Sequence, residues 1–385
     1  MLLDDASLPA FARGCAVLGS GGGGDVGPAL SAAAQAVADH GPVRVVQPEE
    51  LPADGLVMSC GLVGSPVVAT ERIGGDAEAR TLRDTVERLH GVPVAALMSS
   101  EIGGSNGCKA ASWAAGLGLP LVDADGMGRA FPRMDQIAME SAGLAPTPCV
   151  LVDERGRTVV LEHVDGPWLE RLTRGVLDAF GGLAVASEYP LRAGQVREAA
   201  VAGSVSRALA IGEALAGGVP AEPGAGLERL VTGRVVAVER PGGGATAVLV
   251  EGLGGDAGRL LRIEAQSEYL AAYEDGRALA LVPDVVAVLD TRTAAAVQVD
   301  RVRYGLRVSV VTTPSAPVWR TPAGHALTGP TAFGLTDPGK SSPDAPGETG
   351  PGNTAPDAPK ETSPKETSSA APGDAGSSDV GEGGS

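Results

Sequence analysis

The first part of the chain alternates short apolar runs with longer amphipathic segments. The runs are rich in Val and Leu and predict strands over 43–46, 56–60, 92–98 and 119–122. The neighbouring segments 8–18, 28–40, 76–90 and 106–116 predict helices, with Pro9 in a first turn and glycines directly after His40 and His90. Alternation of this kind predicts an α/β domain with a largely parallel sheet.

The pattern changes twice further along the chain. A hairpin over 149–153 and 158–162 and helices over 167–180 and 193–216 precede a Gly- and Pro-rich break at 217–224. Short Val-rich runs then predict a smaller, mainly β domain. These runs are 235–238, 247–250, 260–263, 278–282, 285–289 and 308–312. We therefore predict an α/β domain over 1–220, a mainly β domain over 221–335, and a disordered Pro/Gly/Ser-rich acidic tail over 336–385.

Composition narrows the possible partners. The net charge is −17, of which −6 lies in the tail, and this argues against nucleic acid or an anionic membrane as partner. The four cysteines are far apart and form no CxxC pair, as expected of buried thiols in a reducing compartment. The chain shows neither a signal peptide nor an apolar run of membrane-spanning length, so we expect a cytoplasmic protein. A homo-oligomer is compatible with this composition.

The first segment with candidate functional residues is the glycine-rich stretch 19–25 before a predicted helix. We expect the amides of Gly22, Gly23 and Gly24 to face an anionic or carbonyl oxygen, next to Asp25. The structural alternative is a tight connection. The stretch also matches GxGxxG, which would indicate a dinucleotide-dependent oxidoreductase if residues 15–18 formed a strand.

The second segment lies between a predicted strand and a predicted helix. Glu101 and Asn106 are candidates to face a substrate there. The same segment contains GxSxG around Ser105, and a serine hydrolase is therefore an alternative that requires His163 or His325 as a base.

The third segment follows the strand predicted at 119–122. Asp123, Asp125 and Arg129 crowd a glycine-bent loop at the carboxyl end of that strand, the edge at which α/β sheets bind ligands. The two aspartates, with Glu101 and Asp25, have the oxygen ligands that a divalent cation prefers. Ion pairs with Arg129 are the alternative, so we assign no metal and leave the cofactor unknown.

In the β domain, Glu268 and Asp284 each interrupt an apolar stretch. Taken alone, each residue is consistent with a solvated strand end.

Together these segments resemble one bacterial family, the S-methyl-thiohydantoin desulfurases, which are linked with hydantoinase and oxoprolinase genes. The matching segments are 18–25, 101–106, 122–132, 268–270, 283–284, 304–305 and 329–334. The resemblance covers residues 4 to 335. It implies an enzyme for a small molecule, in which water attacks the sulfur-bearing ring carbon of S-methyl-thiohydantoin, releases methanethiol and leaves hydantoin.

Such a reaction requires a base for water, an acid, and donors for developing charge. The catalytic candidates are Asp25, Glu101 and Asp125, with Asp125 or Glu101 as the base and Asp25 as a second carboxylate. The substrate-binding candidates are Gly22, Gly23, Gly24, Asn106, Asp123, Arg129 and Glu268. The competing hypothesis is a binding or regulatory protein that holds a metabolite in the same pocket without chemistry.

Overall fold

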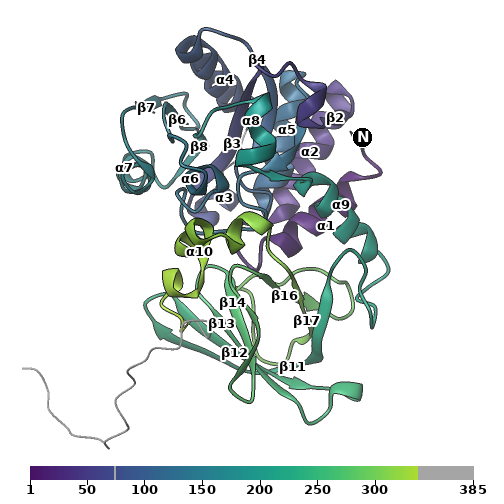
Figure 1. Ribbon diagram of the computed structural model, residues 1–385. Coiled ribbons are helices and arrows are strands. Elements are labelled where there is room, and N and C mark those ends of the chain that lie inside the picture. Colours follow the sequence, from purple (N-terminus) through teal and green to yellow (C-terminus); the bar gives the residue numbers. More distant parts are fainter. Residues whose placement is uncertain (73–74, 337–385) are drawn as a thin grey trace, which may run out of the picture. The chain divides into compact units, whose positions relative to one another are not determined.

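The computed structural model describes residues 1–72 and 75–336, which belong to one compact unit (Figure 1). It contains a ten-stranded mixed sheet with helices, followed in sequence by a seven-stranded antiparallel sheet. The α/β class with a second, mainly β part is therefore confirmed.

The first sheet has the strand order β1-β2-β5-β4-β3-β8-β6-β7, with β9 paired to β3 and β10 to β5. Its strands are β1 (Leu2–Leu3), β2 (Val43–Val46), β3 (Leu56–Gly64), β4 (Val94–Ser99), β5 (Leu121–Asp125), β6 (Cys149–Val152), β7 (Thr158–Leu161), β8 (Leu183–Ser187), β9 (Leu191–Arg192) and β10 (Val201–Ala202). Only β2, β5, β4 and β3 pair in parallel, so the predicted parallel arrangement describes the centre of a mixed sheet.

Helices cover both faces of this sheet because its central strands are nearly continuous apolar runs, with side chains buried on both sides. The helices are α1 (Leu8–Leu18), α2 (Val26–His40), α3 (Pro66–Glu71), α4 (Ala77–His90), α5 (Ser105–Leu117), α6 (Ala138–Ser141), α7 (Gly166–Ala179), α8 (Ala193–Ala199) and α9 (Ser204–Ala214). Leu97 and Leu121 face the core built with α1, α2, α4, α5 and α9, whereas Met98 and Val122 face α6, α7 and α8. No helix in the described ranges is long and apolar enough to cross a bilayer.

The second sheet has the order β15-β14-β13-β12-β11-β17-β16. Its strands are β11 (Glu228–Gly242), β12 (Ala245–Gly252), β13 (Leu260–Ala265), β14 (Tyr269–Glu274), β15 (Arg277–Leu281), β16 (Val285–Asp290) and β17 (Arg307–Thr313). All six predicted strands are present, and β14, which directly follows Glu268, was not predicted.

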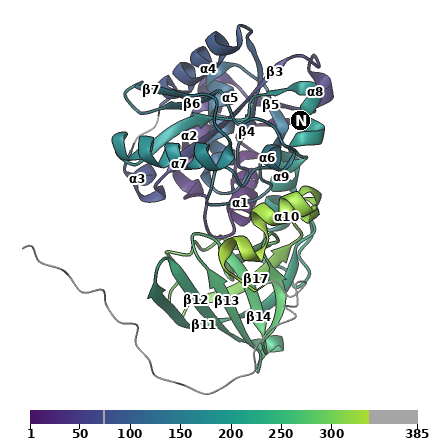
Figure 2. The ribbon, with the colours of Figure 1, turned by 60° about the vertical axis from the view of Figure 1, so that its left-hand side comes forward.

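After β17 the chain returns to the first sheet. Helix α10 (Pro322–Thr328) lies beside α6, as the two views in Figures 1 and 2 show. The preceding Trp319 is fully buried, donates its indole N–H to the Met127 carbonyl at 2.8 Å, and packs edge-on against Phe131 at 5.3 Å. The C-terminal segment thereby fixes the loop that follows β5.

Two predictions about local structure are wrong. The expected helix over 193–216 is broken into α8, β10 and α9, because Gly203 has a φ of +77° and donates its amide to the Asp123 carbonyl at 2.7 Å. Asp123 and Asp125 lie within β5 rather than in a loop, and Asp125 pairs with Val201 of β10.

The domain limits stay predictions. The first sheet ends at Ala202 and the second begins at Glu228, on either side of the boundary predicted at 220. The predicted tail lies outside the described residues from position 337 onward.

Helices α1 and α9 cross with their backbones in contact. A Cβ on Gly14 would lie 1.7 Å from the Ala208 carbonyl oxygen, and a Cβ on Gly212 would lie 1.7 Å from that of Ala10. Glycine at both positions therefore allows an approach that no other residue permits. This crossing matters for function because α1 leads into the glycine-rich loop.

Gly14→Ala should destabilise the fold by about 1–3 kcal/mol, because the new methyl group overlaps the α9 backbone. In a free helix the same change stabilises by about 0.5–1 kcal/mol. The matched control is Gly175→Ala on the exposed face of α7, where a Cβ meets no atom within 4 Å. Urea unfolding measures both variants, and a Gly14→Ala protein as stable as wild type would refute the tight crossing.

Candidate active site

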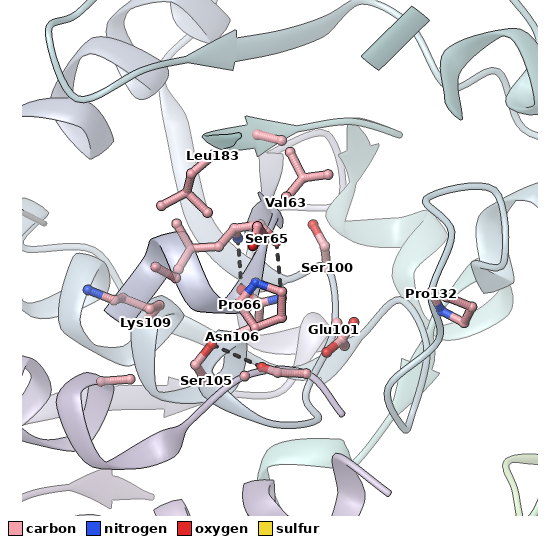
Figure 3. A pocket seen from close by; sticks show the side chains of 18 of the residues that line it. Val63, Ser65, Pro66, Ser100, Glu101, Ser105, Asn106, Lys109, Pro132 and Leu183 are labelled. Carbon is pink, nitrogen blue, oxygen red and sulfur yellow. Dashed lines mark hydrogen bonds between the residues drawn. The ribbon is translucent and has the colours of Figure 1, made fainter. Parts of the chain in front are cut away.

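A cavity of about 500 Å³ lies where several chain segments meet (Figure 3). Its walls come from the glycine-rich loop with the start of α2, the end of β3 with α3, the β4–α5 connection, the loop after β5, and the residues that follow β8 and precede β14. The polar side chains that matter most here are Ser100, Glu101, Asn106, Lys109, Glu188 and Glu268.

The glycine-rich loop is tied to four other segments through its carbonyl oxygens. The amides of Ala130, Tyr269, Val299 and Ser105 donate to the carbonyls of Leu18, Ser20, Gly21 and Gly23 at 3.0, 2.6, 3.0 and 2.8 Å. Ser20 is fully buried with a φ of +51°, and its hydroxyl donates to the Val286 carbonyl at 2.7 Å. The loop therefore joins both sheets at the cavity.

Two glycines of the glycine-rich loop leave space for the carboxylates of nearby glutamates. A Cβ on Gly22 would lie 2.5 Å from Oε1 of Glu268. Gly23 has a φ of +70°, and a Cβ there would lie 2.8 Å from Oε1 of Glu101. The bare backbone at these positions lets Glu101 and Glu268 approach the same short stretch of chain.

Both glutamates are buried, with 8% and 4% of their surfaces exposed. Burial, reinforced by the charges of Glu268 and Asp125, raises the pKa of Glu101 well above its ordinary value, against the lowering effect of Arg129 and a hydrogen bond to the Phe131 backbone. Burial raises the pKa of Glu268 to about 7, again opposed by Arg129. The buried cavity therefore favours the protonated form of both carboxyl groups.

Four buried side-chain oxygens that line the cavity have no hydrogen-bond partner among the described residues. They are Oγ of Ser100, Oε1 of Glu101, Oε2 of Glu188 and Oε2 of Glu268. Burial also raises the pKa of Glu188. Buried polar atoms are usually satisfied, so this concentration in one cavity indicates that a polar ligand or water completes them.

Arg129 lies behind the cavity wall rather than in its lining. It is fully buried, donates to the Asp284 carbonyl at 2.6 Å, and stands 5.0 Å from the centre of the Phe131 ring. Burial lowers its pKa to about 10, opposed by the charges of Glu268, Asp284 and Glu101. A permanent cation therefore lies close to both cavity glutamates.

Asp125 also lies behind the wall. Its Oδ2 accepts from the amides of Ile102, Met127 and Gly128 at 2.8, 3.0 and 2.8 Å, and burial raises its pKa to about 6. These bonds connect the segment that carries Glu101 to the loop after β5. Asp125 thus positions cavity residues without lining the cavity itself.

Asp123 lies outside the lining of the cavity. Its carboxylate accepts from the Ser206 amide at 2.9 Å and from the Gln47 side chain at 3.1 Å, and so anchors the start of α9. It does not line the cavity.

Asp25 and Asn106 do line the cavity, but each is engaged elsewhere. Asp25 caps α2 by accepting from the Gly27 amide at 2.9 Å and pairs with Arg301 at 2.8 Å. Asn106 accepts from the Leu62 amide at 2.8 Å and so holds β3 against the start of α5.

The geometry of the cavity gives less support to the competing hypotheses. Residues 15–18 form the last turn of α1, so the strand that a dinucleotide fold requires is missing at that point. The Ser105 hydroxyl donates to the Gly23 carbonyl at 3.0 Å, and no histidine is among the described residues that line the cavity. Within the described ranges, no three His, Cys, Asp or Glu side chains are arranged to hold a metal ion.

Sequence reasoning missed part of this site. Glu188, Ser100 and Lys109 were not among its candidates. An acidic residue directly after a buried apolar run is a detectable signal for Glu188, but strand β8 before it was not predicted.

Comparison with known proteins identifies the family of this chain. Two family models match, the S-Me-THD-like N-terminal domain over residues 6–163 and the S-Me-THD-like C-terminal domain over residues 164–340. The crystal structure of a protein from Chromobacterium violaceum superposes with a TM-score of 0.70 at 24% identity, covering 87% of this chain and 96% of that one, which shows a shared fold. No curated protein matches. The chain therefore belongs to the S-Me-THD-like family.

Proposed function

We propose that this protein is a hydrolase-like enzyme for a small cyclic amide or thioamide, with an S-methyl-thiohydantoin as its substrate. One observation supports the proposal above all others. Glu101 follows a strand of the first sheet and Glu268 precedes a strand of the second, and both are buried with unpartnered oxygens in one cavity. The volume of about 500 Å³ is within the usual range for small-molecule sites.

The two glutamates suit acid–base chemistry because their pKa values differ. Glu268, whose pKa is raised to about 7, is the group that ionises first and serves as the base. Glu101 keeps its proton to higher pH and serves as the acid. Pairs of carboxyl groups whose environments separate their pKa values are typical of sites that need both functions at one pH.

The proposed reaction balances with water as the only co-reactant. Glu268 takes a proton from water as its oxygen bonds to the ring carbon that bears sulfur, and Glu101 protonates the ring nitrogen of the former C=N bond. The C–S bond then breaks, and methanethiolate takes the proton from Glu268. The new hydroxyl returns a proton to Glu101 as the hydantoin carbonyl forms, so both carboxyl groups regain their starting states.

Backbone groups are placed to bind the ring. The amides of Gly23 and Gly24 donate to no acceptor within the described residues, and both glycines line the cavity. Helices α2 and α5 also begin there, and the start of a helix favours partial negative charge. These donors suit the ring carbonyl oxygen. Arg129 and Asp125 act as positioning residues.

Replacing either glutamate by its amide should remove turnover while the fold persists. We expect Glu101→Gln and Glu268→Gln each to lower the rate of methanethiol release by about 10²–10⁴-fold, the usual contribution of a positioned acid or base. Free thiol is measured with a chromogenic reagent, with Glu228→Gln on exposed β11 as the control for loss of one carboxylate. Rates of both variants within a few-fold of wild type would remove the glutamates from catalysis.

The pH profile tests the assigned protonation states. We expect kcat/KM to rise as the pH passes through about 7, because Glu268 must be ionised, and to fall at higher pH as Glu101 loses its proton. The profile is measured by thiol release in buffers of constant ionic strength. A rate that is independent of pH from acid to mildly alkaline conditions would contradict this assignment.

The burial of Glu268 also predicts that its ionisation lowers the free energy of unfolding. The Glu268 carboxyl ionises near its ordinary value of 4.5 in the unfolded chain but near 7 in the folded one, so stability is lost as the pH rises between these values. Glu268→Gln should therefore be more stable than wild type at pH about 8, by about 1–3 kcal/mol, and equal to it near pH 4.5. Urea unfolding at both pH values checks this. Equal stability at the higher pH, or the same gain in Glu228→Gln, would contradict it.

A further inference from the structure

Glu188 is a third buried carboxyl group in the cavity, and the proposed reaction does not use it. It directly follows β8, has 3% of its surface exposed and lines the cavity. Its Oε2 has no hydrogen-bond partner among the described residues. The three arginines of the cavity lining pair with other carboxylates, in the pairs Arg72–Glu154, Arg133–Asp135 and Arg174–Glu170. This oxygen of Glu188 is therefore open to a ligand.

The backbone on both sides of the Glu188 side chain is fixed. The Glu188 carbonyl accepts a hydrogen bond from the Ser59 hydroxyl. Tyr189 has a φ of +49°, its amide donates to the Pro146 carbonyl at 3.1 Å, and its hydroxyl donates to Glu140 at 2.6 Å. These contacts hold the Glu188 carboxyl group at the cavity, so it is positioned before a ligand enters.

Ser100 occupies the corresponding position directly after β4. Its side chain is buried and lines the cavity, and its Oγ also has no hydrogen-bond partner among residues 1–72 and 75–336. Burial raises the pKa of Glu188 and the Ser100 hydroxyl lowers it, so the two side chains lie close together. The hydroxyl thereby favours the ionised carboxylate, the form that can only accept hydrogen bonds.

The sheet beside these two side chains is almost bare. Strand β3 is the neighbour of both β4 and β8. Its Gly61 pairs with Ala186 of β8, and both residues line the cavity. A Cβ on Gly61 would lie 3.4 Å from that of Ser100, so the glycine leaves space that a larger side chain would fill. Such a position in a strand suits the close approach of a ligand, here a planar ring.

We propose that Glu188 accepts a hydrogen bond from the ring N–H that lies between the ring carbonyl and the reactive carbon, and so restricts the site to rings without a substituent on this nitrogen. The adjacent carbonyl makes this N–H a strong donor. A buried carboxylate that loses its donor is destabilised, so a methyl group in place of this hydrogen is penalised. The other ring nitrogen is the one that Glu101 protonates. The inference rests on the proposed function, which it deepens by naming the part of the ring that the site recognises.

The test compares hydantoin with 3-methylhydantoin, in which a methyl group replaces this hydrogen, by calorimetry on the full chain. Wild type should bind hydantoin at least 10-fold more tightly. Glu188→Ala should lose this preference, because it removes the acceptor and leaves space for the methyl group. Glu188→Gln keeps the shape but not the charge, and should lower the preference several-fold. Glu228→Ala on exposed β11 is the control and should bind as wild type does.

The outcomes separate this inference from the proposed function. Equal binding of the two compounds to wild type, or the full preference in folded Glu188→Ala or Glu188→Gln, overturns the role of Glu188; circular dichroism establishes folding. The reaction is judged by methanethiol release from S-methyl-thiohydantoin. Turnover with equal binding of the two hydantoins would uphold the enzyme and reject the role of Glu188. A preference that depends on Glu188, without turnover, would uphold the contact and reject the reaction.

Discussion

The backbone of residues 18–23 is the constraint on which the site depends. Its carbonyls accept the amide of Ser105, near Glu101, and the amide of Tyr269, next to Glu268. These hydrogen bonds bring segments that are far apart in sequence to one cavity. They require a chain without side chains at Gly22 and Gly23, because a Cβ at either position would occupy the place of a glutamate oxygen. The glycine run costs backbone entropy on folding, but it allows two carboxylates to approach the same stretch of chain.

Burying these carboxylates opposes folding, because removing a charge from water is unfavourable unless it is paired or neutralised. Two features reduce that cost. Burial favours the protonated form of Glu101, and Arg129 supplies a fixed positive charge behind the wall without pairing directly with either glutamate. Asp125 adds rigidity, since three amides from two segments converge on one of its oxygens. The arrangement costs stability, and the acid–base chemistry that we propose would explain why the chain keeps it, since active sites commonly show this balance.

Local sequence predicted most individual elements. Periodicity and end signals placed α1 at the observed bounds and identified each strand of the parallel centre, because these segments are amphipathic or fully buried. The break between α8 and α9 was missed because it depends on Gly203 binding the Asp123 carbonyl, a contact between segments far apart in sequence. The position of Asp125 behind the cavity wall was not predicted, because sequence shows an acidic residue at a strand end but not which way its carboxylate points. Glu268 was found as a candidate, yet its pairing with Glu101 depends on contacts between two sheets that no local pattern encodes.

The central claim is that Glu101 and Glu268 share one cavity and retain a proton at neutral pH. Infrared difference spectroscopy of the wild type and the two glutamine variants tests it directly. The account predicts the carbonyl stretch of protonated carboxylic acids in wild type at pH about 7, and the part that belongs to Glu101 should be lost in Glu101→Gln, leaving that of the partly protonated Glu268. In Glu268→Gln the Glu101 band should remain at neutral pH but be lost at less alkaline pH than in wild type, because the negative charge of Glu268, which raises the pKa of Glu101, is absent. Absence of any protonated-acid band in wild type, or a band that is unchanged in Glu101→Gln, would contradict the account.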